Sequence, residues 1–245
     1  MKERFPYKKC LAWLFWISLW QIAHWLIRNT VIFVGPADML KALFFQVQEK
    51  AFWLTIFHSF LRITLGFLSA FLCGILLGSA AYVLPLIREL AAPLMTLIKS
   101  VPVASFVILA LIWIGSEGLS VFISFLVVVP MIYASTLTGL ENTSKELLEM
   151  ARVFHMPSLN RIRFIYVPAV LPYLLSGCRT ALGMSWKSGI AAEVIGIPVN
   201  SIGEQLYYSK LYLDTAGLFA WTAVIIAVSA LFEALFLGLL KRIRH

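Results

Sequence analysis

Charged residues are scarce in this sequence. Asp, Glu, Lys and Arg account for 13% of its 245 residues, whereas a soluble domain usually carries about 25%. Hydrophobic residues make up 61% of the chain, and the mean hydropathy is +0.89. Too little polar surface is available to cover a soluble domain, so the composition excludes a soluble enzyme and a disordered chain. It predicts an integral membrane protein.

Cysteines and catalytic motifs are also few. Cys10, Cys73 and Cys178 are too widely spaced for a disulfide scaffold. No G-x-x-x-x-G-K-[ST], H-E-x-x-H or C-x-x-C motif occurs, so neither a P-loop nor a metal cluster is expected. Ser185 and Lys187 do not form a catalytic pair, because residues two apart on a helix point in different directions. The chain is not expected to be an enzyme, and a partner must supply any energy that it uses.

The net charge of +8 does not indicate nucleic-acid binding, because the basic residues do not form one patch. They lie at the ends of apolar runs, where membrane-topology signals lie. A helix that crosses the bilayer needs about 20 mostly apolar residues. The apolar runs of suitable length cover residues 11–27, 63–87, 100–116, 118–140, 164–195 and 215–240. The predicted fold is therefore all-α: a polytopic membrane protein with about six transmembrane helices.

Lys and Arg also predict the orientation. With the N-terminus inside, thirteen of them fall in cytoplasmic segments, and only Arg28, Lys41, Lys50 and Lys210 fall in outer segments. Because cytoplasmic loops are enriched in Lys and Arg, we expect both termini to be cytoplasmic. The first apolar run has no small-residue cleavage site, so we expect it to remain as an uncleaved helix.

Polar residues gather between the first run and the rest of the chain, over residues 36–60. They predict a short outer amphipathic helix. The boundary is therefore expected near residue 54. Residues 1–53 would hold one peripheral helix with the outer segment, and residues 54–240 would hold a bundle of five spans.

The longest cytoplasmic loop, residues 141–168, is expected to be ordered. Thr143 or Ser144 can cap a helix, and Met156-Pro157-Ser158 ends it. An apolar stripe at helical spacing lies between them, formed by Leu147, Leu148, Ala151 and Phe154. This helix–turn–helix suits docking of another protein, although it could instead pack against its own bundle. Leu147, Leu148 and Phe154 fit either role.

The same loop resembles the cytoplasmic signature of type I ABC importer permeases, E-A-A, three residues, G, nine residues, I-x-L-P. Glu149-Met150-Ala151, His155 and Ile165-Tyr166-Val167-Pro168 stand at that spacing. Met150 and Val167 are mild replacements, but His155 replaces a glycine. Glycine permits a positive φ that histidine adopts only at a cost. The turn is therefore expected to differ in shape, shifted towards Pro157.

Further motifs resemble the nitrate, sulfonate and taurine branch of these permeases, which includes importers of thiamine-pyrimidine precursors. They are residues 100–102 (SVP), 113–115 (WIG), 177–183 (GCRTALG) and 191–193 (AAE). The resemblance spans residues 54–240. It implies the permease domain of an ATP-driven importer for a small solute, in a bacterial-type inner membrane.

Partners and coupling residues follow from the same resemblance. It implies a homodimer, two ATPase subunits that bind ATP and Mg, and an extracytoplasmic solute-binding protein. The residues expected to couple to the ATPase are Glu149, Met150, Ala151, His155, Ile165, Val167 and Pro168. Two alternatives stay open. A passive channel is one, and the energy-coupling scaffold of a vitamin transporter is the other, although its Ala-Arg-Gly-type motifs do not occur here.

The fifth apolar run carries three charges, Arg179, Lys187 and Glu193. At about 100° per residue they fall within an arc of about 120°, which predicts one polar face. Arg179 would lie about 16 Å from Pro168, near the middle of the bilayer. Such residues line a pathway for anionic solute or pair with interior polar groups. Glu193, near the outer end, is expected to meet the binding protein or to close a gate.

Overall fold

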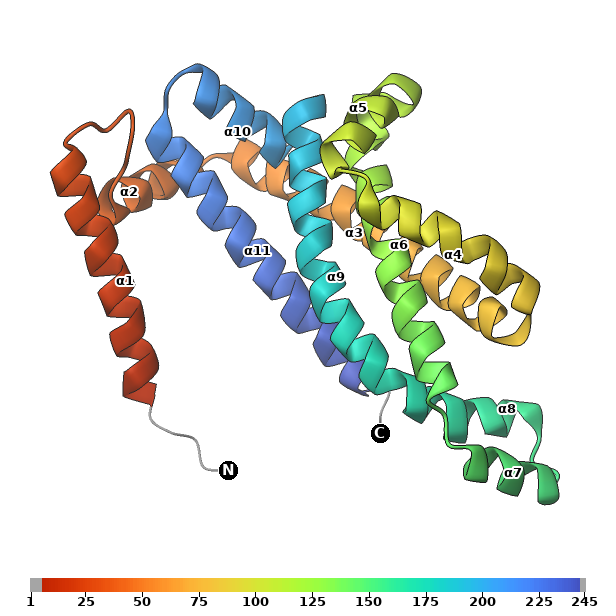
Figure 1. Ribbon diagram of the computed structural model, residues 1–245. Coiled ribbons are helices and arrows are strands. Elements are labelled where there is room, and N and C mark those ends of the chain that lie inside the picture. The colour runs from red at the N-terminus through yellow and green to blue at the C-terminus, as the bar shows by residue number, and fades with distance from the viewer. Residues whose placement is uncertain (1–5, 243–245) are drawn as a thin grey trace.

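The computed structural model describes residues 6–242, and every regular element in that range is a helix (Figure 1). This confirms the all-α fold. The elements are α1 (Pro6–Ile27), α2 (Pro36–Val47), α3 (Lys50–Val83), α4 (Pro85–Ser100), α5 (Val103–Ile114), α6 (Ser116–Glu141), α7 (Lys145–Val153), α8 (Ser158–Arg161), the π-turn η1 (Ile162–Tyr166), α9 (Val167–Gly196), α10 (Ile202–Leu211) and α11 (Thr215–Arg242).

Four helical segments of the described chain are long and apolar enough to cross a membrane: α3, α6, the stretch Ser158–Gly196 that ends with α9, and α11. The pair α4 and α5 adds a fifth if it is counted as one broken span. In α1 a shorter apolar stretch, Leu11–Ile27, accompanies them. The prediction of about six spans is therefore approximately right.

The independent span predicted at residues 100–116 is wrong. That run contains α5, whose 12 residues rise only about 18 Å, against a hydrocarbon core of about 30 Å. It is bent by 104° from α4. Pro102, which has no N–H to continue a helix, stands at the break.

The outer segment also differs from the prediction. The amphipathic helix over residues 36–60 is in fact α2 followed by the first turns of α3. Residue 54, where we expected the boundary, lies inside α3, which is one 34-residue helix. Thr55 and Ser59, polar residues in its first turns, are buried.

Helices α3, α6 and α9 form the centre of the bundle, with α11 beside them (Figure 1). Glycines allow the close approach. A Cβ at Gly74 of α3 would lie 2.7 Å from the Cβ of Ile132 on α6. A Cβ at Gly189 of α9 would lie 2.8 Å from Cγ1 of Ile63 on α3. Small residues at such interfaces let the backbones pack tightly where the hydrophobic effect contributes little between helices.

Helix α1 stands apart from this centre (Figure 1). It joins the bundle through aromatic contacts near one end. The Trp20 indole donates to the carbonyl of Val34 at 2.8 Å and stacks on Phe219 of α11, with 5.7 Å between ring centroids. Most of its other described side chains are exposed and apolar, which suits a helix that faces lipid.

Candidate functional site

The segment of α7, α8 and η1 projects beyond one end of the long helices (Figure 1). It connects the end of α6 at Glu141 to the start of α9 at Val167. Since α6 and α9 both belong to the central bundle, this segment is connected directly to the centre at both of its ends. We call residues 141–168 the coupling segment.

Ser144 begins α7 as its N-cap. Its hydroxyl accepts a hydrogen bond from the Leu147 amide at 3.2 Å and donates to Glu146 Oε2 at 2.6 Å. That donated bond is the main cause that lowers the pKa of Glu146 from its ordinary value of 4.5. The neighbouring Thr143 instead donates to the carbonyl of Gly139 at 3.3 Å. Of the two predicted caps, the structure therefore selects Ser144.

The turn after α7 is a Schellman motif. The Met156 amide donates to the carbonyl of Ala151 at 2.8 Å, and the His155 amide donates to the carbonyl of Arg152 at 3.1 Å. His155 has φ +52°, the left-handed conformation that glycine usually supplies in this motif. The predicted shift of the turn towards Pro157 is therefore wrong. The six-to-one hydrogen bond fixes the turn at His155.

The predicted coupling residues divide by exposure. Ala151 and Ile165 are buried and hold the segment together, and Val167 is half-buried. Glu149 and Met150, like His155 and Pro168, are exposed. A widened π-turn immediately precedes Val167-Pro168, and the Val167 amide donates back to Ile162. Pro168 lacks the N–H that would donate the next hydrogen bond of a regular α-helix, and this favours the π-turn.

Large apolar side chains are exposed on the coupling segment. Val153, Phe154 and Leu159 are 71%, 78% and 75% exposed. Leu147 is also exposed, whereas Leu148 is half-buried. Ala151 is the one residue of α7 that is fully buried. The helix is therefore not packed along its length against its own bundle, and exposed apolar groups that project from a bundle mark an interaction site.

Arg179 and Lys187 lie on an exposed side of α9. The Arg179 side chain is 69% exposed and has its Nε 3.9 Å from Oε1 of Glu233 on α11. Lys187 is exposed two turns further along the helix. Ser176 and Thr180 are exposed beside them, so this side of a membrane-crossing helix is polar. Charged groups at this depth normally face a cavity or another protein.

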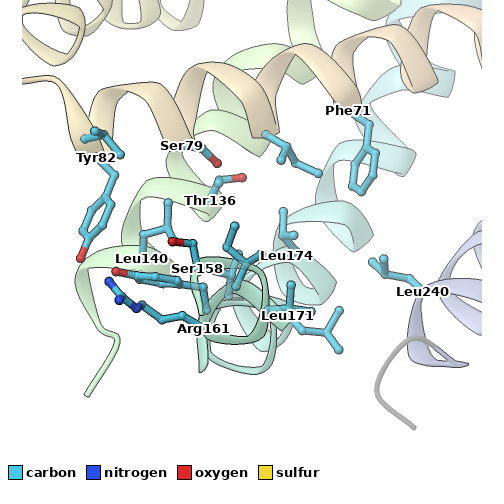
Figure 2. Close-up of a pocket in the computed structure, with 16 residues that line it drawn as sticks. Phe71, Ser79, Tyr82, Thr136, Leu140, Ser158, Arg161, Leu171, Leu174 and Leu240 are labelled. Carbon is cyan, nitrogen blue, oxygen red and sulfur yellow. The ribbon is translucent and has the colours of Figure 1, made fainter. Parts of the chain in front are cut away.

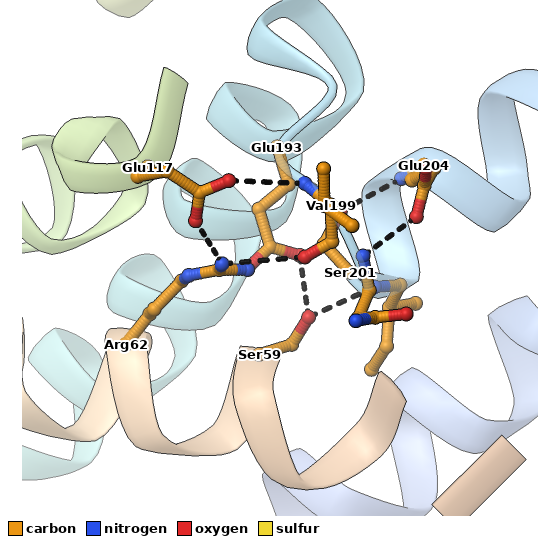
Figure 3. Close-up of polar contacts among 9 residues, drawn as sticks. Ser59, Arg62, Glu117, Glu193, Val199, Ser201 and Glu204 are labelled. Carbon is orange, nitrogen blue, oxygen red and sulfur yellow. Dashed lines mark hydrogen bonds and ion pairs between the residues drawn. The ribbon is translucent and has the colours of Figure 1, made fainter. Parts of the chain in front are cut away.

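Glu193 does not share that side, which corrects the expectation of one polar face. It is fully buried, and its Oε2 accepts from Ser59 Oγ at 2.7 Å and from the Gly203 amide at 3.3 Å (Figure 3). Ser59 in turn accepts from the Ile202 amide at 2.8 Å. The carboxylate therefore joins α3, α9 and the start of α10. A Cβ at Gly203 would collide with the Glu193 backbone, so glycine is needed there.

A second polar cluster, which sequence reasoning missed, lies beside the first. Arg62 pairs with Glu117 Oε2 and donates to the Val199 carbonyl at 3.3 Å (Figure 3). Glu117 Oε1 accepts from the Val199 amide at 3.2 Å. The cluster ties α3, α6 and the loop after α9 together. The signal in the sequence was Arg62, a charged residue at the edge of an apolar run. Its partners Glu117 and Val199 could not be predicted, because they are 55 and 137 residues away along the chain.

These features define a class: a multi-span helical membrane protein whose bundle presents a short helical docking segment at one end. Comparison with known proteins then places the chain. Residues 70–245 match the family described as binding-protein-dependent transport system inner membrane component, and the chain belongs to that family. This confirms the resemblance seen in the coupling segment.

Several characterised relatives are transport permeases. The taurine transport system permease protein of Escherichia coli (strain K12) is 26% identical over 87% of this chain and 80% of its own length. The nitrate import permease protein of Leptolyngbya laminosa is 28% identical over 60% of this chain and 53% of its own. The bicarbonate transport system permease protein of Synechococcus elongatus is 29% identical over 68% of this chain and 63% of its own.

The family and these relatives are transporter subunits and not enzymes. An importer permease of this kind implies ATPase and solute-binding protein partners.

Proposed function

We propose that this chain forms the translocation pathway of an ATP-driven importer and that its coupling segment docks a separate ATPase subunit, which binds ATP and Mg. The exposed apolar surface of Val153, Phe154 and Leu159 is the observation that carries the proposal. A passive channel has no need for such a surface on a projecting helix. Glu149, exposed on α7, adds a charge that can select the partner.

The mechanism follows from the connections of α7. Closure of the ATPases on ATP moves the docked helix as a rigid body. Because the coupling segment continues into α6 and α9, that movement reorients the bundle between two states. ATP binding then shifts the population of these states by the difference in docking free energy between them.

The solute is a small anion or a molecule with an anionic group. Nitrate and bicarbonate are anions, and taurine carries a sulfonate, so the names of the relatives share this chemistry. Arg179 and Lys187, exposed on α9, are the residues of this chain that suit it. Two copies facing each other across this side of α9 would enclose a positively charged pathway.

The test measures how much ATPase subunit is pulled down by the Glu149→Arg variant and by the unmodified chain. Charge reversal in a partly desolvated contact is expected to weaken binding by about a hundredfold. Membrane insertion and the thermal melt of the permease should stay unchanged, because the Glu149 side chain is exposed. Lys145→Glu, an exposed charge reversal one turn earlier on α7, is the control and should have a smaller effect.

Undiminished pull-down with Glu149→Arg would remove this residue from the interface. A lowered melting temperature would instead show that the coupling segment packs on its own bundle. Failure of every ATPase to copurify with the unmodified chain would favour the passive channel.

A further inference from the structure

A groove of about 610 Å³ opens between α3, α6, α9 and the coupling segment, beside the last turns of α11. Most of its walls are apolar, with Phe71, Ile75, Leu174 and Leu240 among them. At one end it becomes polar, where Tyr82, Ser158 and Arg161 lie. Figure 2 shows that Tyr82 and Arg161 converge at that end, while Phe71 and Leu240 lie at the other.

The length of the groove fits one leaflet of a membrane. Phe71 and Tyr82 both line it and are eleven residues apart on α3, which corresponds to about 16 Å. That is about half of a hydrocarbon core of roughly 30 Å. The polar end is the one nearest the coupling segment, which lies beyond the ends of the long helices (Figure 1). With the long helices across the bilayer, the polar end would lie at headgroup level and the apolar end would reach towards the bilayer middle.

Arg161 is incompletely satisfied. Within the described residues its buried Nε has no hydrogen-bond partner, and one terminal nitrogen makes only a long bond of 3.4 Å to the Met156 carbonyl. None of the described residues that line the groove is acidic, and Glu141, which lies near Tyr82, is already paired with Arg88 at 2.7 Å. A buried guanidinium nitrogen without a partner is costly, so the groove favours an anion at this end.

We propose that the groove binds a phospholipid with an anionic headgroup from the leaflet on the coupling-segment side. One acyl chain lies along Ile75 and Leu174 towards Phe71. The headgroup phosphate accepts hydrogen bonds from Arg161 and from the hydroxyls of Tyr82 or Ser158. The charge at the mouth and the apolar length behind it select this occupant, because a small anion alone would leave the apolar walls uncovered.

The site has a consequence for coupling. Arg161 ends α8 and precedes η1, so the headgroup would touch the connection between the docking helix and α9. Lipid binding would then stabilise one arrangement of the coupling segment, independently of the solute that the protein carries.

The experiment counts lipids bound to the purified full-length chain by native mass spectrometry. Dioleoyl phosphatidylglycerol and dioleoyl phosphatidylcholine are titrated separately. The unmodified chain should bind the anionic lipid more tightly. Arg161→Gln should weaken phosphatidylglycerol binding by about tenfold and leave phosphatidylcholine almost unchanged. Arg161→Lys should keep part of the preference. Arg163→Gln, an exposed charge two residues away, is the matched control and should bind like the unmodified chain.

A second pair of variants tests the apolar part. Ile75→Trp fills the groove and should lower the binding of both lipids, whereas Leu76→Trp, on the exposed side of α3, should not. Thermal melts accompany each variant, so that loss of binding without loss of fold is recognised.

Three results would overturn the proposal. If Arg161→Gln and Arg163→Gln weakened phosphatidylglycerol binding equally, the lipid would be held only by the general positive charge of the surface. If inorganic phosphate bound the unmodified chain and Ile75→Trp equally and displaced the lipid, that result would show that Arg161 binds a small anion and not a lipid headgroup. If Ile75→Trp left lipid binding unchanged but abolished dimers, the groove would be a contact surface between two copies of the chain.

Discussion

At the scale of single residues, His155 shows how a local motif can override an intrinsic preference. The Schellman turn requires a left-handed residue after the helix C-cap, and His155 supplies it at φ +52°. A non-glycine residue in this conformation costs about 1–2 kcal/mol. The hydrogen bond from Met156 to Ala151 offsets part of this cost.

We predict that His155→Gly keeps or strengthens the turn and that His155→Val weakens it. Valine is β-branched and tolerates a positive φ poorly, so a loss of about 1–2 kcal/mol is expected. Hydrogen exchange at the Met156 amide is the measurement, and about tenfold lower protection is expected for the valine variant. Equal protection in the valine and glycine variants would contradict the assignment of strain to His155.

Glu193 is the second residue whose surroundings decide its role. Its carboxylate accepts two hydrogen bonds in a fully buried position, and within the described chain its Oε1 and the nearby Ser120 hydroxyl have no partner. It holds the start of α10 on the bundle, at the end opposite the coupling segment (Figure 1).

Glu193→Ala is expected to lower the free energy of unfolding by about 2–4 kcal/mol, because Ser59 and the Gly203 amide lose their acceptor. Glu193→Gln keeps an acceptor oxygen and should cost much less. Thermal melts in detergent test both variants. If the glutamine variant melts as low as the alanine variant, the negative charge is what matters and the hydrogen-bond explanation is wrong.

At the scale of elements, α9 has two distinct polar regions. Glu193 is buried against α3 and α10, whereas Arg179, Thr180 and Lys187 are exposed. A helix that crosses a membrane does not present such residues to lipid without cost. The exposed region is therefore expected to face a second copy of the chain across a water-filled pathway.

We predict that Thr180→Cys, in a chain whose native cysteines are replaced, forms a cross-link to the same position of a second copy with a short bifunctional maleimide. Leu231→Cys, on the exposed apolar side of α11, should not cross-link because that side faces lipid. Gel mobility after labelling in membranes measures both. Cross-linking through Leu231 with none through Thr180 would reverse the assignment of the two faces.

At the scale of the whole molecule, the coupling segment and α10 lie at opposite ends of the bundle (Figure 1). The distribution of Lys and Arg predicts that the coupling-segment end lies in the cytoplasm. We predict that Ser158→Cys in intact cells resists an impermeant thiol reagent and that Asn200→Cys reacts with it. Both positions are exposed, so accessibility does not separate them. Labelling of position 158 from outside would contradict the orientation.

The sequence by itself determined the membrane class, the all-α fold and the location of the coupling segment. These depend on composition and on short-range spacing, such as the apolar runs and the interval from Glu149 to Pro168. The Ser144 cap could also be predicted from the sequence, because its hydroxyl accepts from an amide only three residues away. Hydropathy alone did not show that residues 100–116 contain a short helix bent from α4, although Pro102 marks the break in the sequence.

Only the tertiary structure decided which polar residues meet. Glu193 binds Ser59 across 134 residues, and Arg62 meets Glu117 across 55. Helical periodicity placed Arg179, Lys187 and Glu193 on one arc, but the packing of α3 and α10 buries Glu193 and leaves the other two exposed. The groove beside Arg161 likewise exists only where α3, α6 and α9 come together. Such contacts depend on the crossing of helices far apart in the chain, which no local pattern records.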